Sequence, residues 1–259
     1  RSGQSVLAPR VEAWPHDQPD PDQRRDLTAR LVRWLEAHLT DTLRPLFRLS
    51  EATLTGAARG LAYRLVEAFG SLPRRATRDL AFDLEPADRR RLRECGVRFG
   101  FESVFVPSLL KPRATRLRAL LWVLGRGGAI PALPPPGRVS APATDGVGAD
   151  FYEACGYRVI AGQALRVDML DRFALRLRHD TRTGPVALTV EHLSLVGLSA
   201  EAAAPVVRAL GYRAVEVDGT LKFAARRSGG KTRQRIRSSS PGPLVTDSPF
   251  AKLRELPTR

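Results

Sequence analysis

The stretch ALGYRAVEVDGTLKFAARR, residues 209–227, decides how we interpret the fold of this chain. A helical segment ends at Gly211, and glycine suits the left-handed backbone conformation that closes a helix. The runs RAVEV and TLKFA then alternate apolar and polar residues, which is the pattern of half-buried strands. Asp218-Gly219 between them is a strong signal for a two-residue hairpin turn. We therefore predict a helix followed by a short basic β-hairpin.

The elements before this hairpin extend the pattern. A helical segment begins near Val167, and the shorter apolar segment VEHLSLVG follows at 190–197. Ser199 is placed to cap a further helix, with Glu201 in its first turn, where the helix dipole favours an acid. Helix, short helix, helix and hairpin is the order of a winged helix-turn-helix, whose hairpin can lie along a nucleic-acid backbone. Pro205 lies inside the last helix and argues against that helix reading bases, because it removes a backbone hydrogen bond.

The helix–hairpin pattern has two earlier copies in the chain. RECGVRFGFESVFVPSLL (93–110), EACGYRVIAGQALRVDML (153–170) and RALGYRAVEVDGTLKFAA (208–225) each have a helix end, a glycine, an apolar residue, an arginine and two strand-like runs. The shared positions are Gly96, Gly156 and Gly211, and Arg98, Arg158 and Arg213. We expect longer turns in the first two copies than in the third. The repeat predicts three helix–hairpin units.

The remaining segments complete the predicted organisation. Leucines recur every fourth residue from Leu27 to Leu43, which predicts a helix from Asp26 that ends or kinks at Pro45. Residues 129–149 are rich in proline and glycine and read as a connector. We predict an α+β, mostly helical fold. Its expected parts are an irregular segment 1–25, a helical domain 26–130 with the first helix–hairpin unit, a linker 131–148, a winged-helix-like domain 149–227, a disordered basic tail 228–245 and a docking segment 246–259.

Charge is the strongest bulk property of the chain. Its 259 residues carry a formal net charge of +15, which favours polyanionic partners such as DNA or RNA. Arginine far outnumbers lysine and accompanies abundant alanine, leucine, glycine and proline, so codon usage of a GC-rich bacterium explains part of the excess. Two cysteines form neither a disulfide framework nor a zinc cluster, and no apolar run is long enough to span a bilayer. We expect a cytoplasmic protein without a membrane partner. The start at Arg1, without Met or a signal peptide, indicates a piece of a longer chain.

The predicted binding residues gather on and after the hairpin. No acidic residue interrupts the run from Leu221 to Pro243, and phosphate contacts need cations without a fixed geometry. Tyr212 and Phe223 are predicted to be core residues rather than base-stacking residues, because alternating strand residues usually face the core. The candidate nucleic-acid-binding residues are Arg208, Arg213, Lys222, Arg226, Arg227, Lys231, Arg233, Arg235 and Arg237.

Other candidate sites are weaker. The segment SGGKT (228–232) resembles the end of a phosphate-binding loop, but Ala225 stands where that motif requires its first glycine. Cys95 and Cys155 occupy the same place in the repeat, which packing explains better than catalysis. The histidines have no metal-ligand spacing, and no nucleophile–base pair is suggested. We predict no catalytic residue, metal or cofactor in this chain.

Four segments resemble a known family. They are TGAARGLAYRLVEAFG (55–70), DRRRLRECGVRFGFESVFVPSLLKPRATRLRALLWVL (88–124), FYEACGYRVIAGQALRVDMLDRFA (151–174) and DSPFAKLREL (247–256). Together they resemble the C-terminal, non-motor region of alphaproteobacterial helicase-related proteins, similar to the mitochondrial degradosome RNA helicases of superfamily two. The resemblance implies a motor upstream in the same polypeptide, and any ATP and Mg²⁺ belong to that motor. No catalytic residue of the family maps onto this chain.

Three functions follow from these observations. The leading expectation is an accessory nucleic-acid-binding region of an ATP-dependent helicase. The first alternative is a protein-interaction scaffold that docks a helicase core, a nuclease or a ribosomal partner. The second alternative is a winged-helix transcription regulator.

Overall fold

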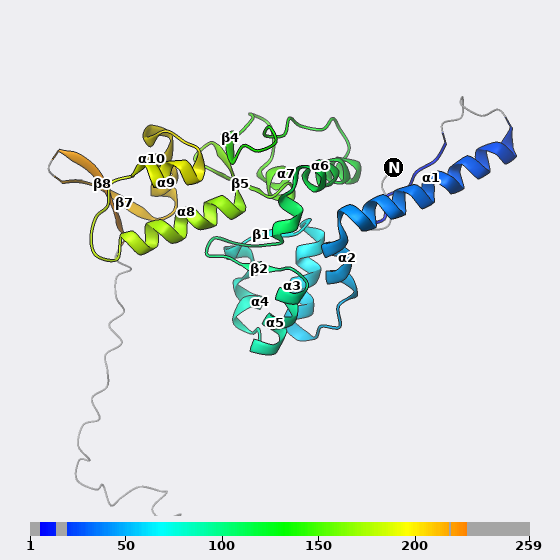
Figure 1. The fold of residues 1–259 in the computed structure, drawn as a ribbon, viewed down its shortest axis with the longest axis horizontal. Helices are drawn as coiled ribbons and strands as arrows, with labels where there is room; N and C mark the ends of the chain where they lie inside the picture. The colour runs from blue at the N-terminus through cyan, green and yellow to red at the C-terminus, as the bar shows by residue number, and fades with distance from the viewer. Residues whose placement is uncertain (1–5, 14–19, 218, 227–259) are drawn as a thin grey trace, which may run out of the picture. The chain divides into compact units, whose positions relative to one another are not determined.

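The fold is α+β and mostly helical, as predicted (Figure 1). The computed structural model describes residues 6–13, 20–217 and 219–226, and the described residues up to Ala225 belong to one compact unit. The predicted basic tail and docking segment lie outside the described residues.

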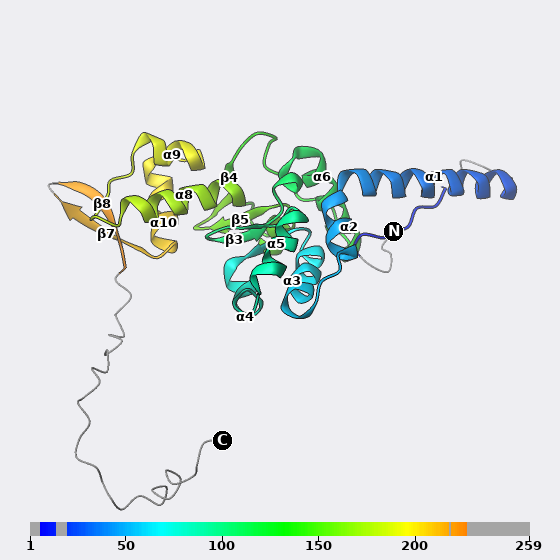
Figure 2. The same ribbon diagram turned by 60° about the horizontal axis from the view of Figure 1, so that its bottom comes forward.

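Two helices precede the repeated units. They are α1 (Pro21–Thr42) and α2 (Arg44–Glu51). Helix α1 begins before the predicted Asp26, because the Asp20 side chain accepts a hydrogen bond from the Asp22 amide and Pro21 suits the first helical turn. Pro45 lies in the first turn of α2, so the break predicted there is observed. Figure 2 shows α1 projecting from α2, and Leu39 near its C-terminal end is its one buried residue within the described part.

Three successive units then each begin with a helix and end with a helix followed by a β-hairpin. The first unit contains α3 (Gly56–Glu67), β1 (Ser71–Pro73), the 3₁₀ turn η1 (Arg74–Thr77), α4 (Arg78–Phe82), α5 (Pro86–Glu94), β2 (Arg98–Phe99) and β3 (Ser103–Phe105). The 3₁₀ turn η2 (Pro107–Leu110) leads to the second unit, with α6 (Pro112–Arg126), β4 (Ser140–Pro142), α7 (Ala149–Ala154), β5 (Tyr157–Ile160) and β6 (Gln163–Arg166). The third unit contains α8 (Val167–Asp180), α9 (Val190–Val196), α10 (Ala200–Ala209), β7 (Tyr212–Val217) and β8 (Thr220–Ala225). The predicted triplication of a helix–hairpin unit is confirmed.

Each unit also pairs an earlier segment with the last strand of its hairpin, which the sequence pattern does not reveal. In the first two units an early strand pairs antiparallel with the last strand of the hairpin, giving the sheet orders β1-β3-β2 and β4-β6-β5. In the third unit Val186 takes the same place and exchanges two backbone hydrogen bonds with Phe223, at 2.9 and 2.8 Å. Strands β1 and β4 are short edge strands that contain Pro73 and Pro142, where proline is tolerated. The predicted connector 131–148 therefore contains a strand.

Glycines end the helix of each unit as predicted. Gly96, Gly156 and Gly211 have φ values of 93°, 83° and 97°, a conformation that glycine adopts without strain. The second hairpin is tighter than predicted, because the pairing of Ile160 with Gln163 leaves two turn residues. The first hairpin has the longer turn that we expected, with Gly100–Ser103 between its paired residues Phe99 and Val104.

A buried arginine joins the first two units. Arg118 of α6 is 0% exposed, and its guanidinium donates to the carbonyl oxygens of Phe69 at 2.9 Å, Cys155 at 3.1 Å, and Leu109. Burial lowers the pKa of Arg118 to about 10, so the group remains charged at neutral pH. Burial also raises the pKa of the Cys155 thiol to about 12, which supports the predicted packing role.

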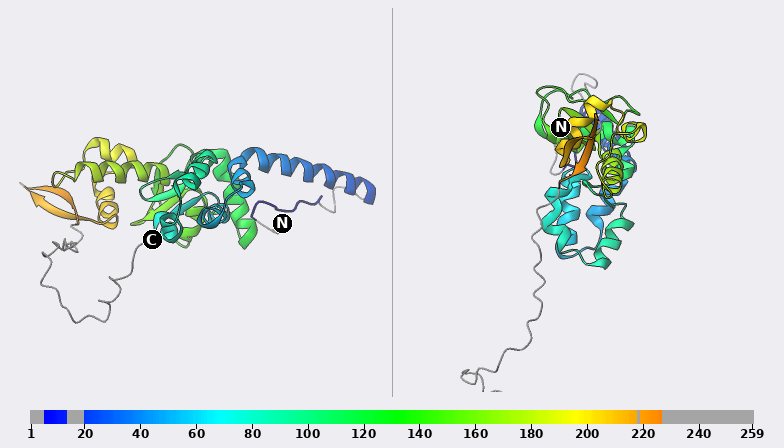
Figure 3. Two further views of the ribbon diagram at one scale, coloured as in Figure 1. Left: turned by 90° about the horizontal axis from the view of Figure 1, so that it is seen from below. Right: turned by 90° about the vertical axis from the view of Figure 1, so that its left-hand side faces the viewer.

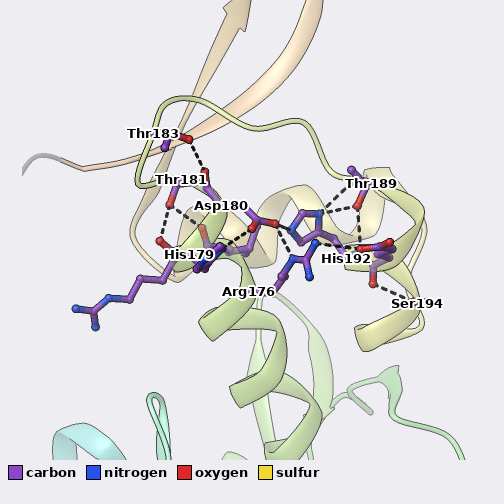
Figure 4. Close-up of polar contacts among 11 residues, drawn as sticks. Arg176, His179, Asp180, Thr181, Thr183, Thr189, His192 and Ser194 are labelled. Carbon is purple, nitrogen blue, oxygen red and sulfur yellow. Dashed lines mark hydrogen bonds and ion pairs between the residues drawn. The ribbon is translucent and has the colours of Figure 1, made fainter.

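A polar network fixes α9 against α8 in the third unit (Figure 4). Thr189 and His192 form a capping box at the start of α9. The Nε2 atom of buried His192 lies 3.1 Å from a carboxylate oxygen of Asp180, which also accepts from Arg176 at 2.8 Å. Hydrogen bonds from His179 and Arg176 hold the pKa of Asp180 at about 2, so this carboxylate stays ionised. The orientation of the short helix is thereby set by side chains at the end of α8.

Crossing a bilayer requires a helix of sufficient length and hydropathy, and no single helix among the described residues meets both requirements. Helices α9 and α10 meet them only when taken together, and a 77° bend separates the two.

Candidate nucleic-acid interface

The predicted hairpin presents part of the expected basic surface. In the register of β7 and β8, Val215 pairs with Lys222 and Arg213 pairs with Ala224, so Arg213 and Lys222 lie on the same face. The opposite face holds Tyr212, 9% exposed, and Phe223, 1% exposed, which confirms that both are core residues. The left-hand view of Figure 3 shows this hairpin beside α8 and α10.

The other predicted residues divide into two groups. Arg208 in the last turn of α10 and Arg226 after β8 are exposed, and within the described part no ion pair involves Arg208, Arg213, Lys222 or Arg226. The five remaining residues lie outside the described residues: Arg227, Lys231, Arg233, Arg235 and Arg237. The described part thus leaves four predicted cations available to a ligand.

A second basic surface, which the sequence did not predict as a site, is a groove between the first unit and α8. The groove has a volume of about 550 Å³ and is lined by six arginines and two aspartates. We call it the arginine groove, and its charged residues are Arg74, Arg89, Arg93, Arg98, Arg172, Arg178, Asp168 and Asp171. One wall comes from α5 and β2 and the other from α8, so residues distant in sequence converge here.

Most of the positive charge in the groove is not neutralised by the chain. Arg93, Arg98, Arg172 and Arg178 are exposed, and no carboxylate in the described part pairs with any of these four. Asp168 is already paired with Arg166, at 2.7 Å. A concave surface with unpaired charge of one sign focuses its field and attracts ions of the opposite sign. The groove is therefore suited to an anion with several charges.

Aromatic rings lie among these arginines. The guanidinium carbon of Arg178 lies 4.8 Å from the centre of the Phe101 ring, and that of Arg89 lies 5.2 Å from the centre of the Phe99 ring. Both rings and both arginines line the groove.

The turn that carries Phe101 is held by side chains from all three units. Asp171 of α8 accepts hydrogen bonds from the amides of Glu102 at 2.9 Å and Ser103 at 3.2 Å (N to Oδ1). Arg158 of β5 forms an ion pair with Glu102 at 2.7 Å. Arg74 donates from its side chain to the Gly100 carbonyl at 3.2 Å. Figure 2 shows the strands of the first unit beside the N-terminal half of α8, where these contacts form.

Gly100 is required for this arrangement because of space. A Cβ atom at this position would overlap the carboxylate of Asp171 and approach the Ser103 carbonyl at 2.7 Å. Any larger residue would therefore separate the turn from α8.

Asp171 is the acidic residue most perturbed by this packing. It is 9% exposed, and burial raises the pKa of its carboxyl group from 3.8 to about 6, against the opposing effect of the two amide donors. The folded state therefore binds this proton more tightly than the unfolded state. Its contribution to stability is fully present below about pH 4 and is lost as the pH rises through about 6.

We predict that Asp171→Asn removes this pH dependence. The amide oxygen still accepts from the two backbone donors, while the cost of burying a charge disappears. Above pH 6 the variant should be more stable than the wild type by about 1–3 kcal/mol, and the difference should shrink between about pH 6 and pH 4. Urea unfolding of both proteins from pH 4 to pH 8 measures this difference. A difference that stays constant over this range would contradict the assigned titration.

Two charged residues carry a sequence signal that could have been recognised. Asp171 and Arg118 each stand on the apolar stripe of an otherwise amphipathic helix, among Leu170 and Ala174 in α8 and Leu117 and Leu121 in α6. A charged residue at such a position is rarely buried without partners. The basic sequence ADRRRLRE similarly indicated the charged helix α5. It gave no sign that α8 forms the opposite wall of the groove.

No protein-family model, curated protein or solved structure matches this chain. Within the described residues, no cluster of three or more histidine, cysteine, aspartate or glutamate side chains could hold a metal ion.

Proposed function

We propose that this chain binds nucleic acid through its phosphate backbone, as an accessory region of an ATP-dependent superfamily-two helicase. The observation that carries the proposal is the arginine groove, which is lined by six arginines and two aspartates. Backbone recognition needs cations at intervals, and arginine binds phosphate with a planar pair of donors. The four exposed arginines without ion pairs supply these contacts.

The C-terminal unit supports the same function. Its helix–helix–helix–hairpin order, with Val186 paired to the last strand, agrees with a winged-helix arrangement. In such an arrangement the hairpin contacts the backbone. Arg213 and Lys222 share the face of the hairpin that is turned away from the core residues Tyr212 and Phe223.

The helicase assignment depends on the family resemblance. That resemblance implies an ATP- and Mg²⁺-binding motor upstream in the same polypeptide, and this region would then hold or guide the strand on which the motor acts. The cytoplasm is the expected location of such an enzyme.

We predict strongly salt-dependent binding to a tailed duplex, which presents both single and double strands. If the chain contacts about four to six phosphates, the slope of log affinity against log salt should lie between about −3 and −5. Fluorescence anisotropy at salt concentrations from about 50 to 200 mM measures this slope. Absent binding at the lowest salt, or an affinity that does not change with salt, would refute the electrostatic basis of the proposal.

The same protein distinguishes the two other functions. A protein-interaction scaffold would keep its partner after nuclease treatment and in high salt. Exposed Trp34 on α1, at 61%, is the apolar feature that favours this second candidate. A transcription regulator would bind one duplex sequence much more tightly than others, whereas backbone binding predicts similar affinities for all sequences.

A further inference from the structure

We propose that the arginine groove takes an unpaired strand and that Phe101 stacks on one of its bases. This inference rests on the proposed function and names the form of nucleic acid that the groove accepts. A groove that contacts phosphates alone would bind single and double strands according to their charge density. An accessible aromatic ring among the cations adds a contact that only an unstacked base can make.

Phe101 has the exposure that stacking requires. The ring is 38% exposed, whereas the neighbouring groove residue Phe105 is 1% exposed and belongs to the core. One side of the Phe101 ring is covered by Arg178, whose guanidinium lies 4.8 Å from the ring centre. A base on the opposite side would complete a stack of guanidinium, ring and base, in which the positive charge also favours the nearby phosphate.

The ring is also held in place before any ligand arrives. Its turn is bound on one side by Asp171, which accepts from the amides of Glu102 and Ser103. On other sides it is bound by the Arg158–Glu102 ion pair, in which both side chains are 19% exposed, and by Arg74 at the Gly100 carbonyl. A platform that is already ordered loses little conformational entropy when a ligand binds. An aromatic residue exposed on a loop without such contacts would lack this advantage.

A second ring extends the same pattern along the groove. Phe99 of β2 is half-buried, and Arg89 and Arg93 of α5 lie 5.2 and 6.0 Å from its centre. Two rings with arginines over them therefore lie two residues apart on one strand-and-turn segment. Alternating rings and cations are the arrangement that proteins use to bind single strands without sequence preference. In a paired duplex the faces of the bases are covered by their neighbours, so a duplex reaches only the cations.

The test compares Phe101→Ala with wild type on two probes of about 12 nucleotides per strand, one single-stranded and one a blunt duplex. The single strand carries a fluorescent base analogue whose emission falls when it stacks. We expect Phe101→Ala to weaken single-strand binding about 5- to 100-fold and to reduce the quenching, while duplex affinity changes less than about twofold. The salt slope should not change, because no phosphate contact is removed.

Matched variants separate stacking from a general loss of structure. Phe101→Trp should retain single-strand binding, because its ring also stacks. Tyr63→Ala should leave both affinities unchanged, since Tyr63 of α3 is an exposed ring, at 67%, that does not line the groove. Equal losses on the two probes, or no loss on either, would overturn the stacking proposal while leaving backbone binding intact. If the wild-type protein bound neither probe at low salt, the proposed function itself would fail.

Discussion

Replacing Arg93, Arg98, Arg172 and Arg178 together by glutamine is expected to raise the dissociation constant for single-stranded nucleic acid by about 10²- to 10³-fold near 0.1 M salt. Each lost phosphate contact makes the log–log salt dependence shallower by about 0.7, so four contacts reduce the slope by about 3. The effect should be large because these side chains are exposed in the groove and no carboxylate of the described chain competes for them. Salt-titrated anisotropy measures both the affinity and the slope.

A matched variant separates the groove from total charge. Arg30, Arg33, Arg44 and Arg48 lie on α1 and α2, are exposed, and do not line the groove. Their replacement by glutamine removes the same net charge and should change affinity by less than about fivefold, because distant exposed charges are screened. Equal losses in the two variants would show that overall charge, rather than the groove, controls binding. No loss in the groove variant would exclude the groove and leave the C-terminal hairpin as the interface.

Replacing Arg118 by methionine is expected to lower the free energy of unfolding by about 2–4 kcal/mol. Methionine fills a similar space, but it leaves the carbonyl groups of Phe69, Leu109 and Cys155 without their donor in a buried site. Removing the buried charge recovers part of the desolvation cost, so the expected loss is smaller than the sum of three broken hydrogen bonds. Urea unfolding at neutral pH measures the change.

Arg116 provides the control on the same helix. It is exposed, and Arg116→Met should change the free energy of unfolding by less than about 0.5 kcal/mol. If Arg118→Met were as stable as the wild type, the buried charge would cost as much as its hydrogen bonds contribute, and Arg118 would not be what joins the first two units.

Local signals in the sequence predicted the repeated parts of the fold. Gly96, Gly156 and Gly211 ended their helices as expected, and Ser199 caps α10 through a hydrogen bond from the Ala202 amide. The burial of Phe223 followed from the alternation in its strand. Each of these features depends on residues close to one another in the chain, which is why pattern and turn chemistry were sufficient.

Features that depend on distant residues were not predicted. Strand β1 has three residues and ends at Pro73, so no alternation could reveal that it pairs with β3. The groove brings α5 and α8 together, and its form depends on Asp171 reaching the turn at Glu102. The charge of α5 was visible in the sequence, but the opposite wall was not. The sequence consequently directed attention to the basic run after the hairpin and away from the groove.

The Gly100–Ser103 turn links strand binding to the folding of all three units, because a side chain from each unit holds it in place. Its anchors Arg74, Arg158 and Asp171 come from the first, second and third units in turn. A fragment lacking α8 would still contain Arg89, Arg93 and Arg98, yet it would have only one wall of the arginine groove. The turn that carries Phe101 would also lose its hydrogen bonds to Asp171. Affinity for a single strand would accordingly depend on whether all three units are folded, and local unfolding of any one unit would release the bound strand.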